Sequence, residues 1–214
     1  MPDTALDPRP RTRDPDQTRR SILDAALAEF AEKGLSGARV DEIAARTATT
    51  KRMIYYYFGS KEGLYAAVLE EMYGGIRDAE QALELDSLDP VAAMRRLIET
   101  TFDYHAAHPE FVRMVAVENI HNARHLQQAP AVADRNDAVI RTLRGLLDRG
   151  ERAGVFRARV DAVDLHLLIS SFCFYRVSNR HTLQAIFGRD LTAPQHVAAH
   201  RRMIVEAVLG WLRP

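Results

Sequence analysis

The residues best suited to chemistry lie between positions 39 and 61, where cations and hydroxyl groups gather. Thr49 and Thr50 stand directly before Lys51 and Arg52, and two tyrosines follow one helical turn later. A threonine hydroxyl at a helix start can accept a backbone N–H, and arginine can form two hydrogen bonds to a guanine edge. The residues that could contact phosphates or bases are Arg39, Thr49, Thr50, Lys51, Arg52, Tyr55, Tyr56 and Lys61.

The elements that would position these side chains are short helices. Apolar spacing predicts one helix near 40–47, a second near 51–57 and a long third helix that opens at Ser60 and runs towards Leu85. In a helix-turn-helix of this kind the first helix braces the second, and the start of the second enters the major groove of double-stranded DNA. The spacing by itself also fits a helical hairpin whose charges are merely solvated.

The overall charge gives no support to nucleic-acid binding, because 29 basic residues balance 29 acidic ones. Phosphates meet a local patch rather than the net charge. Residues 36–61 hold five cations against Asp41 and Glu42. This modest local excess permits DNA binding without establishing it.

Two segments resemble the N-terminal domain of TetR-family (tetracycline-repressor-like) transcriptional regulators. They are ILDAALAEFAEKG at 22–34 and YYYFGSKEGLY at 55–65, whose aromatic run ends in Phe before Ser-Lys-Glu. The resemblance implies a homodimer that binds operator DNA and a small-molecule effector. It implies, most simply, a repressor that the effector releases from its operator.

Two positions depart from the family's pattern. Ala48 stands in the turn where the family usually has glycine, and a positive φ is unfavourable for alanine. Arg39 stands near the position of the usual Ser or Thr N-cap, and its side chain cannot accept a backbone N–H. Arg39 could instead bring a charged contact to a phosphate.

The chain is expected to be all-α, with an N-terminal three-helix helix-turn-helix DNA-binding domain joined to a larger C-terminal helical bundle. We expect a disordered arm at 1–14, the DNA-binding domain at 15–62 and the ligand-binding and dimerisation bundle at 63–214, with about nine helices in total. No convincing strand pattern is present.

The C-terminal half offers apolar and polar residues suited to an effector pocket in a helical bundle. His121 and Asn122 follow Glu118 by about one helical turn, so they are the favoured polar contacts. Ordinary core packing remains open for each apolar residue. The candidate effector-binding residues are Phe102, Tyr104, His105, Phe111, Met114, Glu118, His121, Asn122, Phe172 and Tyr175.

Metal binding and catalysis form the alternative class, a helical metal-binding protein or enzyme with an incidental helix-turn-helix. His121 and His125 have the i, i+4 spacing of a helical metal site, and His105 and His108 lie upstream. No glutamate lies inside the His121–His125 pair, and no glycine-rich phosphate loop or nucleophile elbow occurs. We therefore expect no metal ligands, no cofactor and no catalytic residues.

The last two predicted helices, near 161–180 and 194–212, are the best candidates for the dimer surface. The first is apolar around most of its circumference, which requires burial from several directions. The lone Cys173, the absence of an apolar signal segment and the absence of a membrane-length run predict a cytoplasmic protein with no membrane partner.

Overall fold

The structure, a computed structural model, describes residues 14–214, and of residue 128 the backbone alone. The predicted arm at 1–14 thus lies outside the described residues except for Asp14. The described part contains ten α-helices and two short 3₁₀ helices, with no strand. The predicted all-α fold is confirmed, with one more α-helix than the expected nine. Within residues 14–214 no helix is long and apolar enough to cross a membrane.

Three helices form an N-terminal head: α1 (Pro15–Gly37), α2 (Val40–Thr47) and α3 (Lys51–Phe58). Asp14 caps α1, because its carboxylate accepts the Asp16 backbone N–H at 3.0 Å. Gly34 leaves the helical conformation with φ 66°, which glycine adopts without strain, although the element continues to Gly37. The buried core of the head includes Ile22, Phe30, Ile43 and Ile54.

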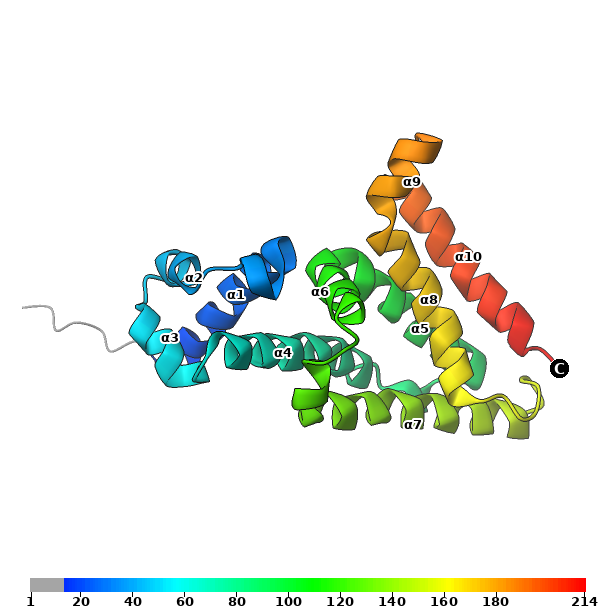
Figure 1. Cartoon of the computed structure of the whole chain (residues 1–214). Helices are drawn as coiled ribbons and strands as arrows, with labels where there is room; N and C mark the ends of the chain where they lie inside the picture. Colours follow the sequence, from blue (N-terminus) through cyan, green and yellow to red (C-terminus); the bar gives the residue numbers. More distant parts are fainter. Residues whose placement is uncertain (1–13) are drawn as a thin grey trace, which may run out of the picture.

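The helix α4 (Lys61–Gln81) runs from the head into the rest of the molecule (Figure 1). The Ser60 hydroxyl begins it by accepting the Gly63 backbone N–H at 2.9 Å. Gly74 and Gly75 stand in the middle of α4, where glycine weakens a helix, yet α4 is one continuous helix. These glycines instead admit close neighbours, since a Cβ there would collide with Arg135 and Tyr104.

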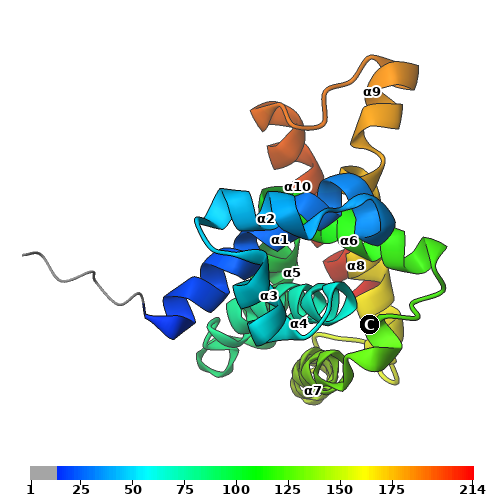
Figure 2. The same ribbon diagram turned by 60° about the vertical axis from the view of Figure 1, so that its left-hand side comes forward.

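Six further helices form the bundle: α5 (Pro90–Ala107), α6 (Pro109–Ile120), α7 (Pro130–Arg152), α8 (Ala162–Ser178), α9 (Arg180–Phe187) and α10 (Pro194–Leu212). Four of them begin with proline, which the first helical position tolerates. α7 packs along α4, and α8 packs against α5, α6 and α7 (Figures 1 and 2). α10 packs on α5 and α8, and α9 projects beyond the end of α8.

The head and the bundle are joined by more than α4. The helix α6 packs against α1. Phe111, Val112 and Met114 of α6 belong to the same buried apolar cluster as Phe30 and Ile43 of the head. A second buried cluster lies among α5, α7, α8 and α10. α6 is therefore positioned to link the interior of the bundle to the head.

Candidate nucleic-acid interface and ligand cavity

The turn between α2 and α3 has the geometry of a helix-turn-helix despite its unusual residue. Ala48 adopts the left-handed conformation, with φ 48° and ψ 36°. Of the two candidate N-cap residues it is Thr50 whose hydroxyl accepts the Met53 backbone N–H, at 3.2 Å. The turn therefore keeps its conformation at the cost of placing an alanine where glycine is favoured.

The start of α3 presents its polar side chains to solvent. Lys51 and Arg52 are exposed, Tyr55 is 39% exposed and Tyr56 is 79% exposed. Ile54 points the other way and is fully buried in the head. Lys51 pairs with Asp41 across the surface at 3.1 Å, which water weakens. These side chains are available to a duplex that approaches the start of α3.

The flanking candidates lie on either side of this helix start. Arg39 is the N-cap residue of α2, and its side chain makes no capping hydrogen bond and is exposed. Thr49 is half-buried in the turn. Lys61 is also half-buried, and its ammonium group donates to the Ser36 carbonyl at 3.4 Å. All eight predicted contact residues thus lie on α2, α3, the turn between them or the start of α4.

A buried carboxylate that the sequence did not single out holds the head in shape. Glu29 of α1 is 0% exposed. It accepts the Arg39 backbone N–H at 3.2 Å and pairs with Lys33 at 2.9 Å and Arg46 at 3.2 Å. Burial acts to raise the pKa of Glu29, but these hydrogen bonds and positive charges outweigh it and lower the pKa. Glu29 therefore ties α1 to both ends of α2 as a carboxylate.

A central cavity of about 280 Å³ lies among α4, α5, α6, α7 and α8. Its volume is close to the lower end of the range for small-molecule sites. Aromatic and aliphatic side chains share its walls with polar ones. The lining residues are Tyr73, Ile76, Arg77, His105, Phe111, Val115, Asn119, Asn136, His166, Leu167, Ser170, Ser171 and Phe174.

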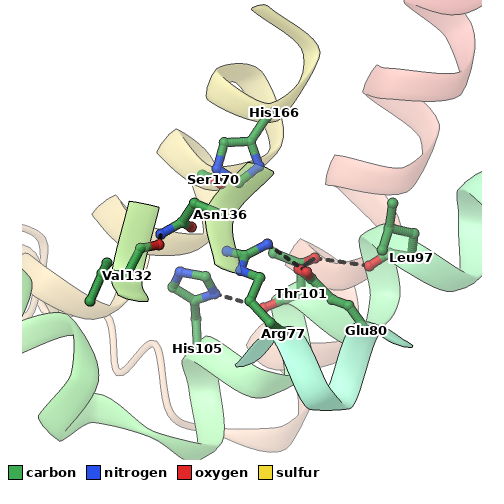
Figure 3. Close-up of polar contacts among 9 residues, drawn as sticks. All are labelled: Arg77, Glu80, Leu97, Thr101, His105, Val132, Asn136, His166 and Ser170. Atoms are coloured by element: carbon green, nitrogen blue, oxygen red, sulfur yellow. Dashed lines mark hydrogen bonds and ion pairs between the residues drawn. The ribbon is translucent and has the colours of Figure 1, made fainter. Parts of the chain in front are cut away.

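Arg77 is the main charged group of this cavity (Figure 3). It is 5% exposed and pairs with the equally buried Glu80, while its Nε has no partner. Thr101 donates to Glu80 at 3.4 Å, and its carbonyl oxygen lies 2.8 Å from the His105 Nδ1. Burial lowers the pKa of Arg77 and raises that of Glu80, and each partner's charge opposes that change.

Further polar side chains complete the wall. Figure 3 shows Asn136 of α7 and Ser170 and His166 of α8 above His105 in this view. Asn136 donates to the Val132 carbonyl at 2.8 Å, and the Ser170 hydroxyl lies 3.3 Å from the His166 Nε2. Burial, with the positive charge of Arg77 next, lowers the pKa of His166 to about 4. The His166 imidazole is therefore neutral at pH 7 and can exchange hydrogen bonds with a ligand.

The predicted effector-binding residues do not come together at one place. His105 and Phe111 line the central cavity. Phe102 and Met114 are fully buried in apolar clusters and line no described cavity. Tyr104 stacks on His108, with ring centroids 4.2 Å apart, beside a smaller cavity between α1, α4 and α5. Phe172 and Tyr175 line a separate pocket at α8, α9 and α10.

The polar candidates Glu118, His121 and Asn122 also lie in different environments. Glu118 is 0% exposed and accepts hydrogen bonds from the Tyr65 hydroxyl at 2.9 Å and from the backbone N–H groups of His125 and Leu126. Its other close contact is the His125 Nδ1 at 2.7 Å. His121 and Asn122, by contrast, are exposed just beyond the end of α6 and line no described cavity. The prediction placed them one turn from Glu118 on the assumption that the helix continues through residue 122. α6 instead ends at Ile120.

The four histidines of the alternative metal hypothesis do not form one cluster, although the ring centroids of His121 and His125 lie 6.3 Å apart. His105 lies in the central cavity, His108 pairs with Glu110 at 3.0 Å, and His125 pairs with Glu118. Within the described part of the chain, no three His, Cys, Asp or Glu side chains are placed to hold a metal ion. Cys173 is buried, and burial raises the pKa of its thiol to about 12.

Sequence reasoning missed most of the polar residues of the cavity, among them Arg77, Asn136, His166 and Ser170. Arg77 and Glu80 have the i, i+3 spacing of an ordinary surface pair, so their pattern gave no sign of burial. One signal was available. Gly74 and Gly75 stand in the middle of a long helix, where glycine is unfavourable unless another element approaches closely.

Comparisons with known proteins agree with this geometry. Residues 22–68 match the family described as "Bacterial regulatory proteins, tetR family", and residues 90–208 match "Tetracyclin repressor-like, C-terminal domain". The chain is 37% identical to the HTH-type transcriptional repressor NicS of Pseudomonas putida, over 95% of this chain and 96% of that protein. It is 35% identical to the HTH-type transcriptional repressor SCO4008 of Streptomyces coelicolor, over 77% and 81% of the two chains.

A solved structure is similar throughout. The regulator SCO4942 of Streptomyces coelicolor superposes with a TM-score of 0.70 at 31% identity, covering 92% of this chain and 99% of that one. The matched segments span the head and most of the bundle. The exposed cations at the start of α3, the helix-turn-helix around them and these matches lead to one conclusion: the chain belongs to the TetR family of DNA-binding transcriptional regulators.

Proposed function

We propose that the protein represses transcription by binding an operator through the start of α3, and that a small molecule in the central cavity releases it. The observation that carries this proposal is the double role of α6. One side of α6 contributes Phe111, Val115 and Asn119 to the cavity wall. Glu118, on the same helix, holds Tyr65 near the start of α4. A ligand that displaces α6 therefore also acts on the helix that follows α3.

On the DNA, the exposed residues divide by role. Arg52 is the candidate for reading a base edge, because a guanidinium can donate two hydrogen bonds to guanine. Lys51, Tyr56 and Lys61 are candidates for phosphate contacts, which position the protein without reading sequence. Arg39 adds a further cation at the start of α2. The repressor role follows the names of two relatives, NicS and SCO4008.

We expect the protein to bind its operator as a homodimer. Leu167 on α8 and Met203 on α10 are 64% and 52% exposed, and Leu168 and Trp211 are 39% exposed on the same two helices. Burying these apolar side chains across a twofold axis favours a homodimer. Such a dimer would present its two α3 helices roughly 34–36 Å apart, one DNA turn, to a pseudo-palindromic operator.

The chemistry of the cavity favours a compact effector with a planar apolar body and at least one hydrogen-bond acceptor. Tyr73, Phe111 and Phe174 supply aromatic walls. The unpartnered Nε of Arg77 would gain from an acceptor, as buried donors are normally hydrogen-bonded. Asn136 offers both a donor and an acceptor. Small aromatic or heterocyclic compounds have these features.

Release requires that the effector bind one arrangement of α6 and α4 better than the other. The arrangement that fits DNA is held by the Glu118–Tyr65 hydrogen bond and by the packing of α6 on α1. We expect the occupied cavity to favour a second position of α6. Because Tyr65 follows Lys61 by one helical turn, such a shift changes where the head sits on the duplex.

Selection of bound sequences from a random DNA library would test the proposal directly. The purified protein should enrich a palindromic sequence, and fluorescence anisotropy on that sequence should give saturable binding. A library of small aromatic and heterocyclic compounds should then contain molecules that reduce the anisotropy. Failure to enrich any sequence would contradict the operator-binding role. Operator binding that no compound relieves would contradict the effector role alone.

A further inference from the structure

A second pocket, larger than the central cavity, lies between the end of α8, α9 and the first half of α10. We call it the outer pocket. Its volume is about 490 Å³, which is ample for a small organic molecule. It shares no lining residue with the central cavity. The lining residues are Phe172, Tyr175, Arg176, Leu183, Phe187, Arg189, Leu191 and His200.

The walls of the outer pocket combine apolar surface with positive charge. Five of the eight lining residues are aromatic or aliphatic, and the other three are Arg176, Arg189 and His200. No aspartate or glutamate is among them. A ligand in this pocket therefore meets a hydrophobic surface and an uncompensated positive potential.

Arg176 is the deepest of these cations. It is 7% exposed, and its guanidinium lies 4.7 Å from the ring centroid of Phe102. Its Nη2 donates to the Leu191 carbonyl at 2.8 Å, while its Nε has no partner. The carbonyl and the ring neutralise no charge, so a buried guanidinium remains without a carboxylate. Burying an unpaired charge is costly, and an anion in the pocket would offset that cost.

His200 adds to the polar side of the pocket but little to its charge. Burial, followed by the positive charges of Arg176, His196 and Arg189, lowers the pKa of His200. The imidazole is thus neutral at pH 7, and its Nδ1 is buried without a partner. The positive charge at neutral pH comes from the two arginines.

We propose that the outer pocket binds an amphipathic organic anion, with its apolar body against Phe172, Leu183 and Leu191 and its anionic group beside Arg176 and Arg189. The buried, unpaired Arg176 favours this occupant over the apolar side chains of a second copy, which would leave its charge without a partner. This site is independent of the effector role assigned to the central cavity.

An anion bound there would also hold α9 in place. None of the residues of α9 is buried, and Phe187 at its end is 71% exposed. A ligand that contacts Leu183 and Phe187 on one side and His200 on the other would bridge α9 to α10. Amide hydrogen exchange in α9 should therefore slow when the pocket is filled.

The test uses 8-anilinonaphthalene-1-sulfonate, an aromatic sulfonate whose fluorescence rises in apolar surroundings, with the full-length protein. We expect saturable binding that Arg189→Glu weakens about tenfold, because the substitution replaces attraction with repulsion. Arg202→Glu is the matched control, since Arg202 is exposed on α10 outside the pocket. Asn136→Ala, in the central cavity, should leave the titration unchanged.

Competition experiments distinguish the contribution of the ligand's negative charge from that of its apolar body. Decanoate should displace the probe and slow hydrogen exchange in α9, whereas decanol, which has the same chain without the charge, should compete about tenfold less well. Equal dissociation constants for Arg189→Glu and Arg202→Glu would overturn the proposal, and so would equal competition by decanoate and decanol. Binding that emerges only when the dimer is dissociated would assign the pocket to a second copy instead.

Discussion

The exposed side chains at the start of α3 form what we call the α3 surface, made of Lys51, Arg52, Tyr55 and Tyr56. This surface and the central cavity both depend on arginine, and they place it in opposite environments. Arg52 is exposed at the start of α3, whereas Arg77 is 95% buried and paired with Glu80. An exposed guanidinium keeps its hydration, and its attraction to phosphates weakens with added salt. A buried one loses its hydration and needs a partner. Surface recognition can therefore be built from one short segment, whereas the cavity requires several helices around one charged pair.

The head and the bundle also each hold a buried glutamate, and the pKa values of the two glutamates are shifted in opposite directions. Glu29 in the head has a lowered pKa, because Lys33, Arg46 and the Arg39 backbone N–H outweigh the effect of burial. Glu80 in the bundle has a raised pKa, because burial outweighs Arg77 and Thr101. The number and exposure of the partners set this difference. Glu29 is stabilised by two cations that reach solvent, and Glu80 by one that does not.

The largest effect should come from Arg77→Ala, which leaves the Glu80 carboxylate buried without its cation. We expect a loss of roughly 3–5 kcal/mol in unfolding free energy at pH 8. The raised pKa of Glu80 fixes the sign of the pH dependence: the penalty is absent below the unfolded pKa and grows as the pH rises. Chemical denaturation at pH 5 and pH 8 should therefore give a smaller loss at pH 5.

A double substitution provides the control for this pair. Arg77→Met with Glu80→Leu removes both charges and keeps an apolar core, so it should recover most of the stability. A loss below about 1 kcal/mol for Arg77→Ala at pH 8 would mean that Glu80 reaches solvent, and the contrast with the α3 surface would fail.

The corresponding change in the head, Glu29→Ala, should cost less, about 2 kcal/mol, because Lys33 and Arg46 can return to solvent. The lowered pKa means that Glu29 stabilises the fold above its unfolded pKa and loses this effect as the pH falls. The stability of wild type and variant should converge towards pH 3. Glu32→Ala, exposed on the same helix, is the control and should change stability by less than about 0.5 kcal/mol.

On DNA, Arg52→Ala should weaken operator binding by about 1–3 kcal/mol and leave binding to random DNA nearly unchanged. Lys61→Ala should weaken both and lower the slope of log K against log salt by about one. Anisotropy titrations at several salt concentrations measure both effects, with Arg96→Ala, exposed on α5, as the control. The same loss on operator and random DNA would move Arg52 to the phosphate contacts.

The smallest effect concerns the cavity wall. Asn136→Ala or Ser170→Ala should weaken the response to an effector by about 0.5–1.5 kcal/mol, the value of one hydrogen bond, while operator affinity stays the same. His121→Ala is the informative comparison, because His121 is exposed and lines no described cavity. A release curve altered by His121→Ala and not by the other two would return the effector site to the end of α6.

The helix-turn-helix could be predicted from sequence because its determinants are local. Ser60 and Thr50 cap the helices that follow them, and Ile54 points inward while Arg52 points outward, as helical spacing requires. The helices predicted near 161–180 and 194–212 also occur, as α8 and α10. α9 was not predicted, because it is only eight residues long and buries none of them, although Leu183, Ile186 and Phe187 have helical spacing.

The cavity could be predicted only in part. His105 and Phe111 were among the candidates, and both line it. Phe102, Met114 and Glu118 lie on the same two helices but turn into the core instead. Helical periodicity tells which residues share a face of a helix. Whether that face meets a cavity or packed core depends on how the neighbouring helices cross.

What the sequence determined by itself is the all-helical fold, the family and the α3 surface, since caps, turns and periodicity act over a few residues. What only the tertiary structure decided is which polar groups meet in the interior. Arg77 and Glu80 look like a surface pair until α5 and α7 pack against α4, and Gly74 and Gly75 look like weak points until the same two helices approach. The physical reason is that burial, and with it the pKa of a charged group, depends on contacts between residues far apart in the chain.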